Sequence, residues 1–234
     1  MEHAFSWHGF AQSFFPPLSA LPEPNFMAII VALVILALAL GFHRALAKAS
    51  EPAIPDDRLG ARGIMELLVD FVIGLSDSII GHKGRKYLSL FGSLFIFILV
   101  ANLMGLIPGF VPPTSDFFSN LALGLVVFVA YNYYGVRENG VRYFKQFLGP
   151  MIFLAPLFIL IELSSHLFRP ISLSIRLFGN MFGDHLVLEI FTGLTKVVIP
   201  VLFYLLGTLV SLIQAAVFTI LSVIYVAMAI SHEH

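Results

Sequence analysis

Long apolar runs separated by short polar stretches make up most of the chain. A helix that crosses the hydrocarbon core of a bilayer needs about 20 residues, most of them apolar. Three runs near this length predict membrane spans at residues 26–47, 88–107 and 117–134. Residues 1–25 precede the first span and are predicted to form a tail, so that residues 26–234 make up a single predicted membrane domain.

A different pattern covers residues 64–80. The apolar positions share one face of a helix, whereas Glu66, Asp70 and Asp77 fall on another face. This amphipathic pattern favours a helix that lies on the membrane surface or on a neighbouring helix over one that spans the bilayer. An ordinary packed amphipathic helix would show the same pattern.

The last two apolar segments, residues 151–192 and 195–230, are too long for ordinary spans. As continuous helices they would extend roughly 60 and 50 Å, whereas the bilayer core is about 30 Å thick. Either these helices break, near Pro156, Pro170 or Pro200, or they lie strongly tilted as a long hairpin.

Segment 151–192 also carries polar residues at steps of three and four, which place them on one continuous stripe of a helix. The members of this polar stripe are Glu162, Ser165, Arg169, Ser172, Arg176, Asn180 and Gly183. An arginine at the middle of a span costs at least about 2.5–3.5 kcal/mol on insertion scales. Ionisable groups in a span usually mark an ion path, so the stripe predicts one.

Two further ionisable residues of this segment lie off the stripe. His185 is roughly 180° around the helix from Arg176, and Glu189 follows His185 by one turn. The last segment carries a milder polar stripe that includes Gln214 and small residues such as Gly207, which allow helices to approach closely. We therefore expect two antiparallel packed helices, with Gln214 facing the polar stripe.

Structural roles remain open for these residues. Arg176 could be a snorkelling or structurally paired arginine. Asn180 and Gln214 could join two helices by hydrogen bonds rather than line a water path, and His185 with Glu189 could form a structural pair.

Composition narrows the class of protein. The 234 residues are 59% hydrophobic and only 12% charged, with a mean hydropathy of +0.94, a formal net charge of −1 and no cysteine. Such a chain cannot cover its surface with polar side chains in water, which excludes an ordinary soluble enzyme, a disordered protein and a nucleic-acid binder. Without cysteine or any nucleotide-binding or hydrolase motif, the sequence predicts no cofactor and no thiolate metal site.

The distribution of positive charge predicts the orientation. Ten of the 13 Lys and Arg residues lie in three polar stretches: Arg44, Lys48, Arg58 and Arg62; Lys83, Arg85 and Lys86; Arg137, Arg142 and Lys145. The three simple spans place all of these stretches on one side of the membrane. The positive-inside rule then puts the N-terminus outside and the C-terminus in the cytoplasm, with Lys196 as the exception.

Four strings in the sequence resemble the signature of a known family. They are SIRLFGNM at residues 174–181, NLMGLIP at 102–108, RPISL at 169–173 and IQAAVFT at 213–219. In combination they closely resemble subunit a of F-type ATP synthases, and the resemblance runs from about residue 26 to the end.

The resemblance implies an all-α membrane protein with five membrane-embedded helices and one amphipathic interfacial helix. The last two membrane helices would form a long, strongly tilted hairpin against the rotating c-ring. It also implies a multi-pass protein of the bacterial inner membrane whose partners are the c-ring, the peripheral-stalk b subunits, the lipid bilayer and protons, with no nucleic acid. Such a subunit binds no nucleotide and is not an enzyme by itself.

The implied mechanism uses two offset half-channels that carry protons to and from carboxylates of the c-ring. Arg176 matches the family's essential arginine, which attracts the ionised carboxylate and blocks a direct leak between the half-channels. Arginine suits this task because it cannot lose its proton. Asn180 and Gln214 match polar residues beside that arginine, and Glu162 and Ser165 match the cytoplasmic outlet.

One departure from the family affects the outer access path, where His185 matches a path residue. Relatives often place an ionisable residue seven positions before the glutamine, and this chain has Gly207 there. We expect Glu189, one turn from His185, to supply the missing carboxylate, with Asp116 and Asp184 as the other candidates.

Two other classes of function compete with this interpretation. A stand-alone ion transporter or channel would be expected to show paired halves or a substrate site at broken helices, and neither is evident. A non-conducting membrane scaffold would leave the polar stripe unexplained.

Overall fold

The computed structural model describes residues 6–14, 21–47, 60–140, 143, 155–194 and 198–231. These residues form helices and short 3-10 turns without any strand. The elements are α1 (Trp7–Phe14), α2 (Glu23–Ala47), α3 (Ala61–Ile79), η2 (His82–Tyr87), α4 (Leu88–Met104), η3 (Pro113–Ser115), α5 (Phe117–Asn139), α6 (Ala155–Leu194) and α7 (Val198–Ile230). Within this described part, five helical stretches are long and apolar enough to cross a membrane. The predicted all-α membrane fold is confirmed.

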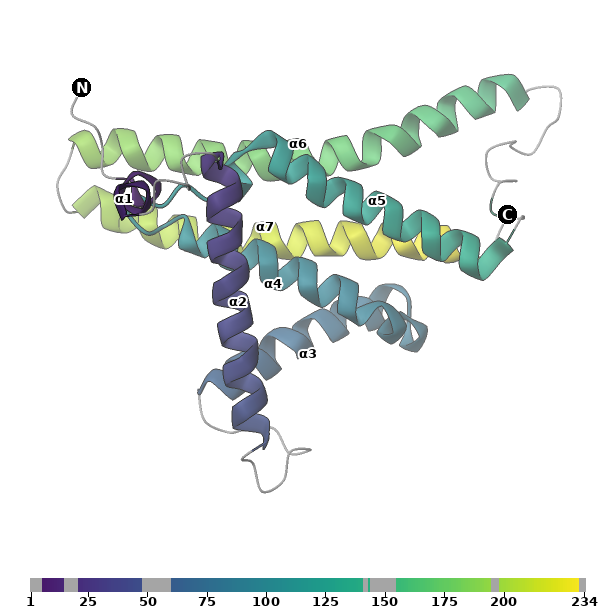
Figure 1. Cartoon of the computed structure of the whole chain (residues 1–234). Coiled ribbons are helices and arrows are strands. Elements are labelled where there is room, and N and C mark those ends of the chain that lie inside the picture. Colours follow the sequence, from purple (N-terminus) through teal and green to yellow (C-terminus); the bar gives the residue numbers. More distant parts are fainter. Residues whose placement is uncertain are drawn as a thin grey trace.

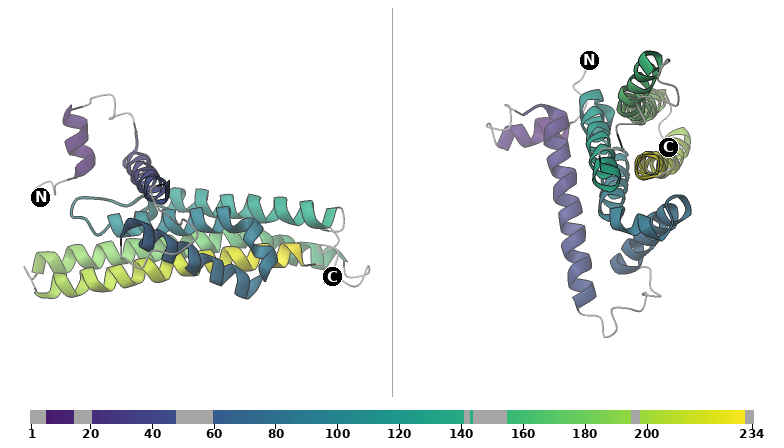
Figure 2. Two further views of the ribbon diagram at one scale, coloured as in Figure 1. Left: turned by 90° about the horizontal axis from the view of Figure 1, so that it is seen from below. Right: turned by 90° about the vertical axis from the view of Figure 1, so that its right-hand side faces the viewer.

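Helices α6 and α7 form a long antiparallel hairpin, in which the two helices lie close together toward the end of α6 and diverge toward its beginning (Figures 1 and 2). Both are continuous, with Pro170 inside α6 and with Pro156 and Pro200 in the first turns of their helices. A proline in the first turn is tolerated because its missing N–H has no intrahelical partner. The alternative that these helices break near a proline is therefore wrong, because both helices are continuous. Figure 1 shows α2 crossing the direction of this hairpin, so a bilayer that α2 spans would hold α6 and α7 steeply tilted.

The backbone around Pro170 explains how α6 remains a helix there. Proline has no N–H to donate to the carbonyl group of His166, one turn earlier. The Tyr131 hydroxyl of α5 lies 3.5 Å from that carbonyl oxygen, and the Ser174 hydroxyl donates to the Pro170 carbonyl oxygen at 2.7 Å. Gly124 of α5 packs directly on this turn, since a Cβ there would come within 2.6 Å of the Pro170 oxygen. Helix α5 thus supports α6 where its hydrogen-bond ladder is interrupted.

The buried core lies where α4, α5, α6 and α7 meet. Its fully buried large side chains include Phe91, Phe95, Ile98, Tyr131, Leu173, Leu177 and Phe218. Many other large apolar side chains of the long helices are exposed on the outside of the chain. Because lipid tails are as apolar as these side chains, such exposure is expected of a protein surrounded by a bilayer.

Two elements contact the membrane helices from the side. Helix α1 forms within the predicted tail and is tied to the α4–α5 loop, because the Trp7 indole donates to the Pro108 carbonyl at 3.1 Å. Helix α3 packs against α2, α4 and α7, but its apolar residues Ile64, Leu67 and Phe71 are exposed, so both alternatives for the amphipathic segment stay predictions. At the end of α3, the Arg85 guanidinium lies 2.8 Å from the Asp77 carboxylate, and its hydrogen bond lowers the pKa of Asp77.

Candidate functional site at the α6–α7 hairpin

Four residues of the polar stripe of α6 are left exposed by the rest of the chain. The packed face of the helix is made of His166, Pro170, Leu173, Ser174, Leu177 and Met181, all of which are buried. The stripe residues Ser165, Ser172, Arg176 and Asn180 are exposed. Polar groups on a membrane helix that its own chain leaves uncovered are expected to meet water or a partner protein.

Arg176 lies near the middle of α6 and is exposed. Among the described residues, none forms a hydrogen bond or an ion pair with its guanidinium. An unpaired cation at this depth in a membrane protein calls for an opposite charge. The described part of the chain places no carboxylate beside this guanidinium.

Arg169 is held very differently, two turns earlier on the same stripe. Its side chain is only 18% exposed, and its guanidinium lies 3.9 Å from the Glu162 carboxylate. The guanidinium also lies over the rings of Tyr131 and Tyr225, at 6.0 and 5.4 Å from their centroids. These contacts, from α5, α6 and α7, satisfy the charge of Arg169 within the chain.

Asn180 and Gln214 join the two helices of the hairpin. The Asn180 amide donates to the Gln214 side-chain oxygen at 2.5 Å, and Gln214 is 3% exposed. The position of Gln214 facing the polar stripe agrees with the sequence-based expectation. Its side-chain nitrogen is buried and has no hydrogen-bond partner among the described residues. The bridge therefore leaves one buried donor open beside Arg176.

The proposed outlet residues lie towards the beginning of α6. Glu162 has a side chain that is 36% exposed, and Ser165 is exposed one turn later. His166 follows directly but points into the packing between α5 and α6. Its ring meets those of Phe128 and Tyr131 edge to face, and its Nε2 lies 2.9 Å from the Asn132 side-chain oxygen. The structure thus brings Glu162 close to Arg169 and assigns His166 to the core.

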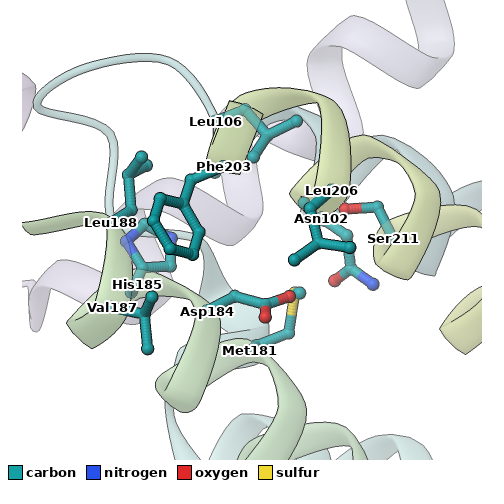
Figure 3. A pocket seen from close by; sticks show the side chains of 12 residues that line it. Asn102, Leu106, Met181, Asp184, His185, Val187, Leu188, Phe203, Leu206 and Ser211 are labelled. Atoms are coloured by element: carbon teal, nitrogen blue, oxygen red, sulfur yellow. The ribbon is translucent and has the colours of Figure 1, made fainter. Parts of the chain in front are cut away.

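A cavity of about 270 Å³ opens between the end of α4, the C-terminal half of α6 and the N-terminal half of α7 (Figure 3). Its lining residues are Asn102, Gly105, Leu106, Met181, Asp184, His185, Val187, Leu188, Phe203, Leu206, Gly207 and Ser211. His185 lines this cavity, and its place on an outer access path stays a prediction. The side chain of Glu189 lies outside the described part of the structure, and its predicted pairing with His185 stays a prediction.

Two glycines shape this cavity. A Cβ at Gly105 would come within 2.7 Å of the Pro112 ring and 3.0 Å of the His185 Nε2, so glycine there makes room for the imidazole. A Cβ at Gly207 would come within 2.8 Å of the Leu106 side chain. The position at which the resemblance implies an ionisable group is thus covered here by a leucine from the α4–α5 loop.

Sequence reasoning missed or underrated three polar lining residues. Asn102 belongs to one of the quoted strings and Ser211 to the milder stripe of the last segment, but neither was assigned a role. Asp184 is only an alternative to Glu189 in the sequence-based prediction, because a step of three from Asn180 places Gly183, rather than Asp184, on the stripe. The reserve candidate Asp116 instead caps α5, where its carboxylate accepts hydrogen bonds from the backbone and hydroxyl of Ser119 at 2.8 and 3.0 Å. In the described part, no three His, Asp or Glu side chains gather as a metal site.

Comparisons with known proteins show a family to which the chain is similar over most of its length. The family model described as ATP synthase A chain matches residues 25–227. The chain is 46% identical over 190 residues to ATP synthase subunit a of Bdellovibrio bacteriovorus, which covers 81% of this chain and 83% of that protein. It is 38% identical over 234 residues to ATP synthase subunit a 3 of Pelobacter propionicus, which covers the whole of both chains.

Proposed function

The chain belongs to the ATP synthase subunit a family and is a multi-pass protein of that enzyme's membrane sector. From this premise we propose that it is the stationary proton-conducting subunit, which carries protons to and from a rotating c-ring through two offset half-channels. The observation that carries the proposal is Arg176, an exposed cation midway along a membrane helix that has no partner among the described residues.

The missing partner of Arg176 is the membrane carboxylate of a c subunit. A protonated carboxyl group of the ring that arrives on the stripe face would lose its proton to the outlet, and the carboxylate that forms would then be attracted to the guanidinium. Because arginine stays protonated at every working pH, it cannot pass a proton on to the other half-channel. Arg176 would therefore both dock the rotor and separate the two water paths.

The two half-channels would reach Arg176 from opposite ends of α6. The inlet is the cavity at the far end, with His185 in its lining. The outlet is the surface around Glu162 and Ser165, at the near end. Asn180 and Gln214, whose amides bridge α6 and α7 beside the arginine, stand at the inner end of the inlet. A proton would cross between the paths only while bound to the ring.

The proposed orientation of the chain in the membrane rests on the distribution of Lys and Arg between the two ends of the helix bundle. Helix α1 and the α4–α5 loop lie together, through the contact of Trp7 with Pro108, and contain no Lys or Arg. The opposite end gathers Lys83, Lys86 and Glu138 around Ser231. By the positive-inside rule the basic end faces the cytoplasm of a bacterial cell, whose inner membrane would hold the complex with its peripheral-stalk b subunits.

The function is tested in inverted membrane vesicles that contain the whole ATP synthase. Arg176→Ala should abolish ATP-driven proton pumping, leave the complex assembled, and raise the passive proton leak, because the charge that separates the half-channels is lost. Arg137→Ala removes an exposed arginine at the end of α5 and is the control that should pump normally. A stand-alone transporter would instead be purified without a ring or catalytic head, and its transport would not depend on ATP synthase.

The orientation has its own test, for which the cysteine-free chain provides a clean background. Cysteines placed at Ser6 and Ser115 should react with an impermeant thiol reagent added outside intact cells. Cysteines placed at Ser78 and Ser231 should react only after the cells are opened. The reverse labelling pattern would invert the assignment of inlet and outlet.

A further inference from the structure

The inlet cavity contains a carboxylate to which the proposed function gives no role. Asp184 lines the cavity, and its Oδ2 atom is buried with no hydrogen-bond partner among the described residues. Burying a carboxylate oxygen without a partner is costly. Asp184 is also the only acidic side chain in the described lining, and its carboxylate can take up a proton from water and release it again.

Two more polar atoms of the cavity lining are buried without a hydrogen-bond partner among the described residues. The Asn102 side-chain nitrogen and the Ser211 hydroxyl are buried and without partners in the described part. The Asn102 oxygen accepts a hydrogen bond from Thr114 at 2.7 Å, which fixes the amide and leaves its nitrogen as an unused donor. In Figure 3 the Asn102 amide and the Asp184 carboxyl group point toward the same part of the cavity.

Water is the ligand that satisfies these three groups. They come from three different helices, α4, α6 and α7, and surround one space of about 270 Å³. A water molecule occupies about 30 Å³ in the liquid and needs two to four polar partners. The cavity therefore has both the room and the donors and acceptors for a small water cluster in contact with Asp184.

The position of Asp184 connects this cluster with the arginine. Asp184, Asn180 and Arg176 follow one another at steps of four, which places them on neighbouring turns of one side of α6. Asp184 lies about 12 Å from Arg176 along the helix axis. On α7, Ser211 precedes Gln214 by one turn, and Gln214 accepts the Asn180 hydrogen bond. Polar side chains thus continue from the cavity to the arginine on both helices.

We propose that Asp184 is the proton-accepting carboxylate of the inlet half-channel and that Asn102 and Ser211 hold the water that delivers the proton. This inference rests on the proposed function. An O–H bond of a hydrated proton breaks as the carboxylic O–H bond of Asp184 forms. That bond then breaks in turn, and the same proton passes through water beside Asn180 to a carboxylate of the ring, so Asp184 is regenerated.

The surroundings of Asp184 favour it over the carboxylate that relatives place on the last helix. At Gly207 the space for a side chain is filled by Leu106. The lining residues from α4 and α7 include no titratable group, and His185 is the titratable neighbour from α6. The acidic group of the inlet is therefore carried by α6 in this chain, with the imidazole next to it.

The test compares three variants of the complete enzyme in vesicles. Asp184→Asn keeps the size of the side chain but cannot take up a proton, and it should slow proton-driven ATP synthesis about ten-fold or more. Asp184→Glu should restore most of the rate and shift its dependence on outside pH. Asp77→Asn is the matched control, since Asp77 lies at the end of α3 away from the cavity, and its rate and pH profile should equal those of the wild type.

A second readout tests the water cluster without relying on the rate of Asp184→Asn. Silver ions should block proton flow through Ser211→Cys and Asn102→Cys, because water-filled space admits a small hydrated cation. Normal rates and an unchanged pH profile for Asp184→Asn would overturn the inference, and so would silver-resistant flow in both cysteine variants. If Arg176→Ala still abolishes pumping in that case, the inference fails and the proposed function stands. If Arg176→Ala pumps normally, both fail.

Discussion

Arg169 and Arg176 stand two turns apart on one stripe of α6, yet the chain treats them in opposite ways. Arg169 is largely covered, lies near Glu162 and is stacked over two tyrosine rings from α5 and α7. Arg176 is exposed, and no described residue pairs with it. The comparison separates a cation that is paired within the chain from one for which the proposed function requires a charge on another protein.

The same division runs along the whole helix. The packed face of α6 meets α5 and α7 through tight contacts, such as the approach of Gly124 to Pro170. The stripe face has open space, and a Cβ added at Gly179 would meet nothing within 4 Å. Substitutions on the packed face should therefore act on stability and assembly, whereas those on the stripe face should act on proton flow.

The largest contrast is expected from exchanging each arginine for lysine. Arg176→Lys should lower ATP-driven pumping by about 100-fold or more, as expected when a preorganised electrostatic contact is lost. Lysine lacks the planar guanidinium and can lose its proton when desolvated. Arg169→Lys should keep most of the pumping, because lysine retains a charge near Glu162 and over the tyrosine rings. Equal losses at both positions, measured in vesicles with equal amounts of assembled enzyme, would remove the distinction.

A pair of glycine substitutions tests the two faces without changing any charge. Gly124→Ala would place a Cβ within 2.6 Å of both the Pro170 oxygen and the Ser174 hydroxyl oxygen. Backbone has to move, so a destabilisation of about 1–3 kcal/mol is expected. Gly179→Ala should leave the chain as stable as before, since alanine is the better helix former. The measurement is the temperature at which the purified complex loses the subunit.

Because Gly179 lies on the exposed face of α6, Gly179→Ala could also change proton pumping without changing stability. A loss of pumping in a complex of unchanged thermal stability would show that a rotor surface passes close to Gly179. Gly9→Ala, on α1 and also with nothing within 4 Å, is the control that should change neither property.

The division between these faces was only partly predictable from the sequence. The spacing of polar residues at steps of three and four around Arg176 predicts the stripe, and the length of the last two apolar segments predicts the hairpin. Both are properties of a single helix and need no knowledge of its neighbours. The covering of Arg169 by Tyr131 and Tyr225 depends on residues far apart in the chain, which periodicity along α6 cannot identify.

The inlet cavity shows the same limit. His185 could be placed there through the resemblance, but the roles of Asn102 and Ser211 depend on how α4 and α7 meet α6. Gly207 indicated that something differs from relatives, without showing that Leu106 fills the space. Helix α1 was missed for a related reason: it is short, and its Trp7 contact with the α4–α5 loop is tertiary.

A smaller effect is expected from removing the charge of Arg169. Arg169→Gln loses the attraction to both tyrosine rings and to Glu162, which at a partly desolvated site amounts to about 1–2 kcal/mol. The loss should appear as a lower temperature of subunit release, with pumping per assembled complex nearly unchanged. Tyr225→Leu should cost a similar amount, and Arg169→Gln combined with Tyr225→Leu should cost less than the sum. Strict additivity would mean that the ring contact does not stabilise the hairpin.

The smallest effect on stability is expected at the bridge between Asn180 and Gln214. A variant of this bridge also distinguishes amides that only join the helices from amides that line a water path. Interhelical hydrogen bonds in membrane proteins average about 0.6 kcal/mol. Asn180→Leu combined with Gln214→Leu removes both amides, together with the buried unpartnered nitrogen of Gln214, and should leave the thermal stability of the complex within about 0.5 kcal/mol of the wild type. If the amides only join the helices, this double variant will pump normally. We expect it to pump poorly despite its stability, because apolar side chains would fill the space beside Arg176 through which water brings the proton to the ring.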